Sequence, residues 1–157
     1  MPRIYDNAEI EVRAPAAAAF AIVERDILTV SDEPGAISGH RPMSPGPLRQ
    51  GFRWQQWGMH ERHSCFTEWR ITAVETPRML EQESWHYCAV ARADGYSGER
   101  WDFVERGDGT TLVTLNAWRS RPGLAGWLEK LWGGPCARLA EYSIRRRLNV
   151  VQFEAER

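Results

Sequence analysis

The sequence predicts an α+β protein in which an antiparallel sheet packs against a long C-terminal helix. A strand and then a helix open the chain, and residues 52–119 show short runs of alternating polarity separated by turn residues. After Pro122 the apolar period becomes helical. No internal repeat or low-complexity segment interrupts the 157 residues, so we expect one domain over residues 1–157.

The N-terminal part predicts strand, helix and then irregular chain. Ile10 and Val12 alternate with glutamates, as in a half-buried strand. Pro15 suits the first turn of a helix, and the four alanines at 16–19 have the highest helix propensity. The stretch 32–51 is rich in proline and glycine, so there we expect a short helix followed by an irregular edge strand.

The rest of the chain predicts a meander and two helices. The expected strands are 52–60, 63–74, 79–88, 97–105 and 110–119. Gly133-Gly134-Pro135 then separates a short helix from a long one. In the long helix one apolar stripe recurs at spacings of three and four: Ala137, Ala140, Ile144, Leu148, Val151 and Ala155.

Composition excludes several classes of protein. The formal net charge of -1 gives no field that would attract nucleic acid, and no apolar run is long enough for stable membrane insertion. Three widely spaced cysteines without a CxxC pair favour a reducing cytoplasm. The near absence of lysine fits a GC-rich bacterial genome, and Arg145-Arg146-Arg147 is interpreted as a solvated helix flank rather than a phosphate site.

The spacing of the turns predicts which side chains lie on each face of the sheet. If Glu61-Arg62 is a two-residue turn, it fixes which residues of the two flanking strands lie opposite each other. The later turns do the same for the strands that follow them. Residues directly opposite share a face, so one face carries three rows. The rows are Trp54, Trp69, Gln82, Phe103, Leu112; Gln56, Thr67, Ser84, Trp101, Thr114; and Gly58, Cys65, His86, Glu99, Asn116. The other face carries most of the charges, and a slip of one residue in the GDGT turn would reverse the last strand.

The first face combines aromatic walls with buried polar groups, which favours a ligand cavity over a closed core in which those groups satisfy one another. The expected ligand-binding residues are Trp54, Gln56, Thr67, Trp69, Gln82, Ser84, Trp101, Phe103 and Trp118. Trp57 and Trp85 point outward, either as exposed single residues or as part of a homodimer contact.

Four segments carry a resemblance to a known superfamily: IEVRAPAAAAFAIV, RQGFRW, WRITAVETPRML and GDGTTLVTL. Together with the order of elements, the chain resembles the START/birch-pollen-allergen-like (SRPBCC) superfamily and its polyketide cyclase/dehydrase-like branch. The resemblance implies a helix-grip fold: a curved seven-stranded antiparallel sheet wrapped around the C-terminal helix, with two short helices after the first strand. It also implies a cavity for a hydrophobic ligand between sheet and helix.

Three functions follow from this interpretation. The chain is expected to bind a hydrophobic, aromatic or polyketide-like small molecule, and whether it also cyclises and dehydrates that molecule is open. In an enzyme, His86 beside Glu99 would be the general base and Asn116 a hydrogen-bond donor to the enolate. The alternatives are a non-catalytic carrier or sequestering self-resistance protein, and an interaction module such as a chaperone activator.

The HERH motif raises the question of a metal site. Its histidines, His60 and His63, lie three apart at a strand end, whereas a metalloprotease HExxH needs four on a helix. No third ligand is evident, so we interpret the motif as a polar hairpin tip and expect neither metal nor cofactor. Cys65 is interpreted as a small buried hydrophobic residue.

Overall fold

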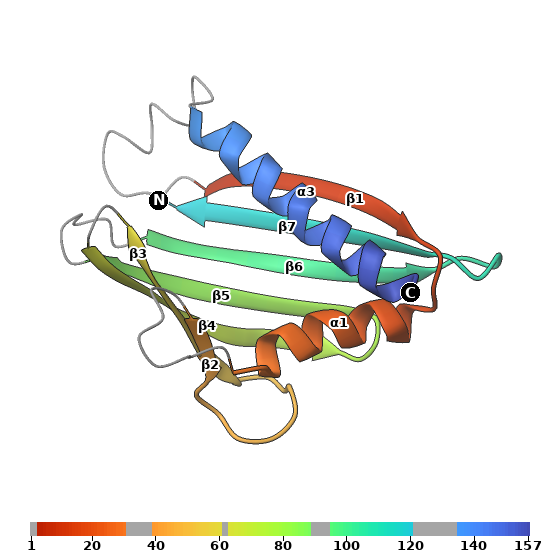
Figure 1. Ribbon diagram of the computed structural model, residues 1–157, viewed down its shortest axis with the longest axis horizontal. Coiled ribbons are helices and arrows are strands. Elements are labelled where there is room, and N and C mark those ends of the chain that lie inside the picture. The colour runs from red at the N-terminus through yellow and green to blue at the C-terminus, as the bar shows by residue number, and fades with distance from the viewer. Residues whose placement is uncertain (1–2, 31–38, 61–62, 89–94, 121–134) are drawn as a thin grey trace.

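A computed structural model describes residues 3–30, 39–60, 63–88, 95–120 and 135–157. They form a seven-stranded antiparallel sheet in the order β1-β7-β6-β5-β4-β3-β2, and two helices lie on one face of it (Figure 1). The strands are β1 (Arg3–Val12), β2 (Gly39–Pro42), β3 (Arg53–His60), β4 (His63–Glu75), β5 (Met79–Cys88), β6 (Gly95–Glu105) and β7 (Thr111–Ser120). The helices are α1 (Ala16–Leu28) and α3 (Pro135–Ala155). This is the predicted helix-grip architecture.

Helix α1 starts where the sequence predicts it. Pro15 is its N-cap, and the helix buries Phe20, Val23 and Ile27 against the sheet. The first free N–H, that of Ala16, donates to the Glu105 carboxylate across the end of β6 at 2.9 Å. A helix N-terminus favours such an anion, so this contact fixes α1 to the sheet.

Helix α3 crosses the same face of the sheet and contacts β1, β7 and α1 (Figure 1). Ile144, Leu148 and Val151 are 5%, 1% and 3% exposed, which confirms the predicted stripe over the part whose side chains are described. Ala155 packs against the same core, while the side chains of Ala137 and Ala140 lie outside the described residues. No helix within the described ranges is long and apolar enough to cross a membrane.

The observed strands begin and end within two residues of the predicted ones. The expected edge strand after α1 is β2, and residues 43–52 form turns. Of the two short helices expected after the first strand, the described residues contain α1 only, and 31–38 lie outside them. The short helix expected between Pro122 and Gly133 also falls outside the described residues.

The register of the sheet is right in its first hairpin and displaced in the next two. Trp54 pairs with Trp69 as predicted. Trp69, however, pairs with Ser84 rather than Gln82, and Gln82 pairs with Glu99 rather than Phe103. These displacements are by two and by four residues, and an even displacement leaves each side chain on its predicted face. The side chains of these strands therefore lie on the predicted face, but their partners on the neighbouring strands differ from the predicted ones.

Strand β7 has the opposite facing to the prediction. Phe103 pairs with Val113, and Val113 and Leu115 are fully buried on the inner face. The cause is the turn after β6, which has three residues, Gly107–Gly109, with Gly109 at φ 82°. A three-residue loop closed by a left-handed glycine shifts the pairing by one relative to a two-residue loop.

Candidate functional site

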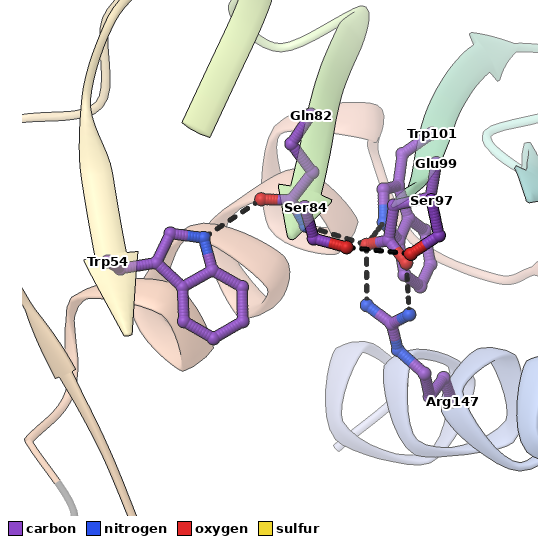
Figure 2. Close-up of polar contacts among 7 residues, drawn as sticks. All are labelled: Trp54, Gln82, Ser84, Ser97, Glu99, Trp101 and Arg147. Atoms are coloured by element: carbon purple, nitrogen blue, oxygen red, sulfur yellow. Dashed lines mark hydrogen bonds and ion pairs between the residues drawn. The ribbon is translucent and has the colours of Figure 1, made fainter. Parts of the chain in front are cut away.

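A carboxylate lies at the centre of the inner face, beneath α3. Glu99 of β6 accepts hydrogen bonds at Oε1 from Gln82 Nε2 at 2.7 Å and from Trp101 Nε1 at 3.0 Å (Figure 2). Arg147 of α3 binds both carboxylate oxygens, with Nη2 2.7 Å from Oε1 and Nη1 against Oε2. The group therefore has four N–H donors and ties the C-terminal helix to the sheet.

The electrostatics of this pair keep it ionised. Burial raises the pKa of Glu99, but the charge of Arg147 and the hydrogen bonds from Arg147, Trp101 and Gln82 outweigh burial, so the pKa lies below its ordinary value. The Glu99 side chain is 4% exposed and that of Arg147 is 42% exposed. Solvent therefore reaches the arginine, whose guanidinium also lies over the Trp101 ring at 5.0 Å.

The hydrogen-bond chain continues from Gln82 to a pair of stacked indoles. Trp54 Nε1 donates to Gln82 Oε1 at 2.9 Å, and the Trp54 and Trp69 rings stack at 5.2 Å with 5° between their planes. His40 of β2 meets Trp54 edge-on at 6.1 Å. The orientation of Trp54 is thus fixed by one hydrogen bond and two ring contacts.

A cavity of about 480 Å³ lies between these indoles and the two helices. Its apolar wall comes from α1, α3 and three tryptophans, and its polar groups include Asp26, Arg146 and Arg147. The lining residues are Ile22, Val23, Asp26, Ile27, His40, Trp54, Gln56, Trp69, Trp101, Ser143, Arg146, Arg147, Val150 and Val151. The indole N–H of Trp69 is buried and has no hydrogen-bond partner within the described part of the chain.

The predicted ligand-binding residues divide into three groups. Trp54, Gln56, Trp69 and Trp101 line the cavity. Gln82 orients Trp54 and Glu99 from behind the wall. The remaining four do not line the cavity: Ser84 bonds Ser97 at 2.6 Å, Thr67 bonds His86, Phe103 packs edge-on against Phe20 at 5.5 Å, and Trp118 lies on the outer face.

The predicted catalytic trio is not assembled, which corrects the sequence interpretation. His86 pairs with Gly95 near the end of β5, is exposed, and shares a 2.8 Å hydrogen bond with Thr67 instead of meeting Glu99. Asn116 pairs with Arg100 and so lies on the outer face, opposite to Glu99. The one-residue difference in β7 has the same effect on Trp118, which lies on the outer face and not on the cavity wall.

Sequence reasoning missed the partner of Glu99. The predicted solvated helix flank fits Arg145 and Arg146, which are exposed, but Arg147 binds Glu99. The signal was present in the spacing, because Arg147 lies three residues after Ile144 and four before Val151, on the buried stripe. A cation on that stripe requires an anion on the facing sheet.

The HERH motif lies at the end of the β3–β4 hairpin. His60 pairs with His63, as the two-residue turn predicts. Their side chains and that of Cys65 lie outside the described residues, so the expected absence of a metal stays a prediction. Among the described residues, no three His, Cys, Asp or Glu side chains gather as metal ligands do.

Comparison with known proteins identifies the fold. No family model and no curated protein sequence matches the chain. The solved structure of Ara h 8.0201 matches with a TM-score of 0.61 and 7% identity, covering 99% of this chain and 96% of that one. Major latex-like protein 151 from Panax ginseng gives 0.61 and 9%, covering 96% and 97%. The di-domain ARO/CYC StfQ from the steffimycin biosynthetic pathway gives 0.58 and 19%, covering 97% of this chain and 44% of that one. The chain therefore has the helix-grip fold of the birch-pollen-allergen-like (SRPBCC) and polyketide-cyclase-like proteins.

Proposed function

We propose that this protein binds a planar, hydrophobic, aromatic or polyketide-like small molecule in the cavity between the sheet, α1 and α3. The observation that carries the proposal is the cavity itself, about 480 Å³ and walled by Trp54, Trp69 and Trp101. That volume lies within the range of roughly 300–1,000 Å³ typical of small-molecule sites. Stacked indoles offer a flat apolar surface, which suits a ring system better than a flexible chain.

The wall is organised before any ligand arrives. Trp54 is held by Gln82, which also donates to Glu99, and Glu99 is held by Arg147. A ligand that stacks on a fixed ring immobilises no additional side chain, so little of its binding free energy is lost to ordering.

Binding without turnover is the form of the proposal that the geometry favours. A general base needs a free lone pair and a pKa near the working pH. Glu99 already accepts four N–H donors and has a lowered pKa, and His86 lies outside the cavity lining. We therefore propose a carrier or sequestering role ahead of catalysis.

Cyclisation and dehydration of a polyketide is the second candidate. The observation behind it is the likeness in fold to StfQ, which is described as a di-domain ARO/CYC from the steffimycin biosynthetic pathway. It requires a proton acceptor other than the predicted trio, and the described lining offers Asp26 and His40.

Tryptophan fluorescence tests the binding proposal. We expect 1,8-dihydroxyanthraquinone, a planar tricyclic probe, to quench the emission of the wild-type protein saturably. Trp54→Ala should weaken its binding by roughly 1–3 kcal/mol, about five- to 150-fold, because one aromatic wall is lost. Trp85→Ala is the matched control: it removes a tryptophan of the same sheet from the opposite face and should leave the affinity unchanged.

Two results would contradict the proposal. One is the absence of saturable quenching across a panel of fused-ring and lipid-like probes. The other is equal weakening by Trp54→Ala and Trp85→Ala, since the cavity wall contains only the first of these residues.

A further inference from the structure

The outer face of the sheet, opposite to the helices, carries a row of aromatic side chains that the cavity does not use. Directly paired residues share a face, and Trp85 pairs with Glu68, Tyr87 with Phe66, and Phe66 with Trp57. Across the other half of the sheet, Tyr96 pairs with Trp85 and Tyr5 with Trp118. The described members of this aromatic band are Tyr5, Trp57, Phe66, Trp85, Tyr87, Tyr96 and Trp118.

Ring contacts join five members of the band in two groups, one on β4 and β5 and the other on β5, β6 and β7. Phe66 and Tyr87 stack at 4.6 Å, Trp85 contacts Tyr96 at 5.5 Å, and Tyr96 contacts Trp118 at 4.9 Å. Trp118 lies flat over Gly98, where an added Cβ would stand 2.3 Å from the indole ring. The sheet thus accommodates the ring closely against its backbone, which makes a broad surface rather than a set of protruding side chains.

Three members of the band are exposed, and the other four are half-buried. Tyr5 is 67% exposed, Tyr87 42% and Phe66 39%, and neither α1 nor α3 covers this face. With roughly 200 Å² for each whole side chain, these three alone present roughly 300 Å². Since a standard dimer buries about 800 Å² on each partner, the band is large enough to form the apolar centre of such an interface.

The charged residues beside the band favour a second copy of the chain as the partner. Arg70 and Glu83 are cross-strand neighbours on the outer face, and neither has an ion-pair partner among the described residues. A nucleic acid or an anionic membrane would require net positive charge here. A second copy turned about a two-fold axis would bring the arginine of each chain to the glutamate of the other.

We propose that the aromatic band is the centre of a homodimer interface in which two sheets pack outer face to outer face. Sheets that stack in this way bury their aromatic rows against each other, as the two layers of a β-sandwich do. Tyr and Trp are the residue types enriched at the centre of interfaces, and a charged rim completes the surface. The proposal is independent of the cavity on the other face.

Sedimentation velocity and multi-angle light scattering at 1–100 µM test the proposal. The wild-type chain should dimerise over this range. Phe66→Glu and Tyr87→Glu should each weaken dimerisation at least tenfold, because both would place a carboxylate at the apolar centre. Val104→Glu is the matched control, since Val104 is 56% exposed on the same face of β6, eight residues from Tyr96, and this variant should dimerise like the wild type.

A charge exchange tests the two-fold arrangement. Arg70→Glu and Glu83→Arg should each weaken the dimer alone, and an equimolar mixture should form a heterodimer in which both opposite-charge contacts are restored. Circular dichroism verifies that each variant is folded. A wild-type chain that stays monomeric at 100 µM would overturn the proposal, as would a dimer unaffected by Phe66→Glu and Tyr87→Glu or a mixture that fails to associate.

Discussion

Glu99 is a buried carboxylate whose ionisation depends on one helix. Moving an ion out of water is costly, and here four N–H donors compensate, two of them from Arg147. Because Arg147 is 42% exposed, removing the carboxylate leaves a cation that water can still reach. The pair therefore contributes less than a fully sealed ion pair, and its main structural effect is to fix how α3 lies on the sheet.

Glu99→Gln should lower the free energy of unfolding by roughly 2 kcal/mol, the scale of hydrogen bonds to a charged group. The amide is isosteric, so the change removes charge without opening a cavity. Urea unfolding at pH 7 measures it. Arg146→Gln, an exposed change on the same helix, is the control and should stay within about 0.5 kcal/mol of wild type. Equal stability of both variants would mean that the ion pair contributes nothing net.

The difference in unfolding free energy between wild type and Glu99→Gln should depend on pH. The folded-state pKa of Glu99 lies below its ordinary value of about 4.5, so folding favours the ionised form. The stabilisation is complete above about pH 4.5 and is lost as the pH falls through the folded pKa. The stability difference between wild type and Glu99→Gln should therefore be constant from pH 8 to about 5.5 and narrow below 4.5.

The residues of the site show what a sequence can predict. Trp54, Trp69 and Trp101 were placed correctly on the cavity wall, because facing depends only on alternation along a strand. The prediction that His86 lies beside Glu99 was wrong. Which residues pair across two strands depends on the length of the turn between them, and turns of several lengths fit the same composition. Arg147 is hard to recognise from the sequence because it stands in a run of three arginines, two of which are solvated.

Among the elements, the turns decide register and facing. Trp54 faces Trp69 as predicted because His60 pairs with His63, with two residues between them in the sequence. Between β4 and β5, residues 76–78 form a three-residue turn, and a bulge between Ile71 and Ala73 shifts the pairing back by one. Such a bulge has no sequence signature here, whereas the strands themselves were predictable from their alternating pattern.

The turn before β7 provides a prediction about local strain. Gly109 has φ 82°, a left-handed conformation that an L-residue adopts at a cost, although an added Cβ would meet nothing within 4 Å. Gly109→Ala should therefore destabilise the protein by about 1 kcal/mol through backbone strain alone. Gly107→Ala, in the same turn, equally open and without a positive φ, should be neutral or slightly stabilising. Urea unfolding compares the two, and equal effects would show that conformation at Gly109 is not the determinant.

On the scale of the whole molecule, one sheet separates two surfaces of different character. Its inner face holds the cavity and the ionised Glu99, and both helices close it. The outer face has no helix over it among the described elements (Figure 1). It carries the aromatic band. Helix α3 contributes to both the charged and the apolar parts of the inner face, because Arg147 binds Glu99 and the apolar stripe packs in the core.

The integrity of the inner face should therefore depend on how α3 docks. Ile144 is 5% exposed and belongs to the core that contains Val12 of β1 and Phe20 of α1. Ile144→Asp would bury a carboxylate without a partner, at a cost of several kcal/mol that is comparable to the stability of a small domain. We expect this variant to unfold or aggregate. Tyr142→Asp, two residues earlier on the same helix and 67% exposed, should melt within a few degrees of wild type by circular dichroism. If Ile144→Asp kept the wild-type melting temperature, packing of the apolar stripe would not be what holds α3 on the sheet and closes the cavity.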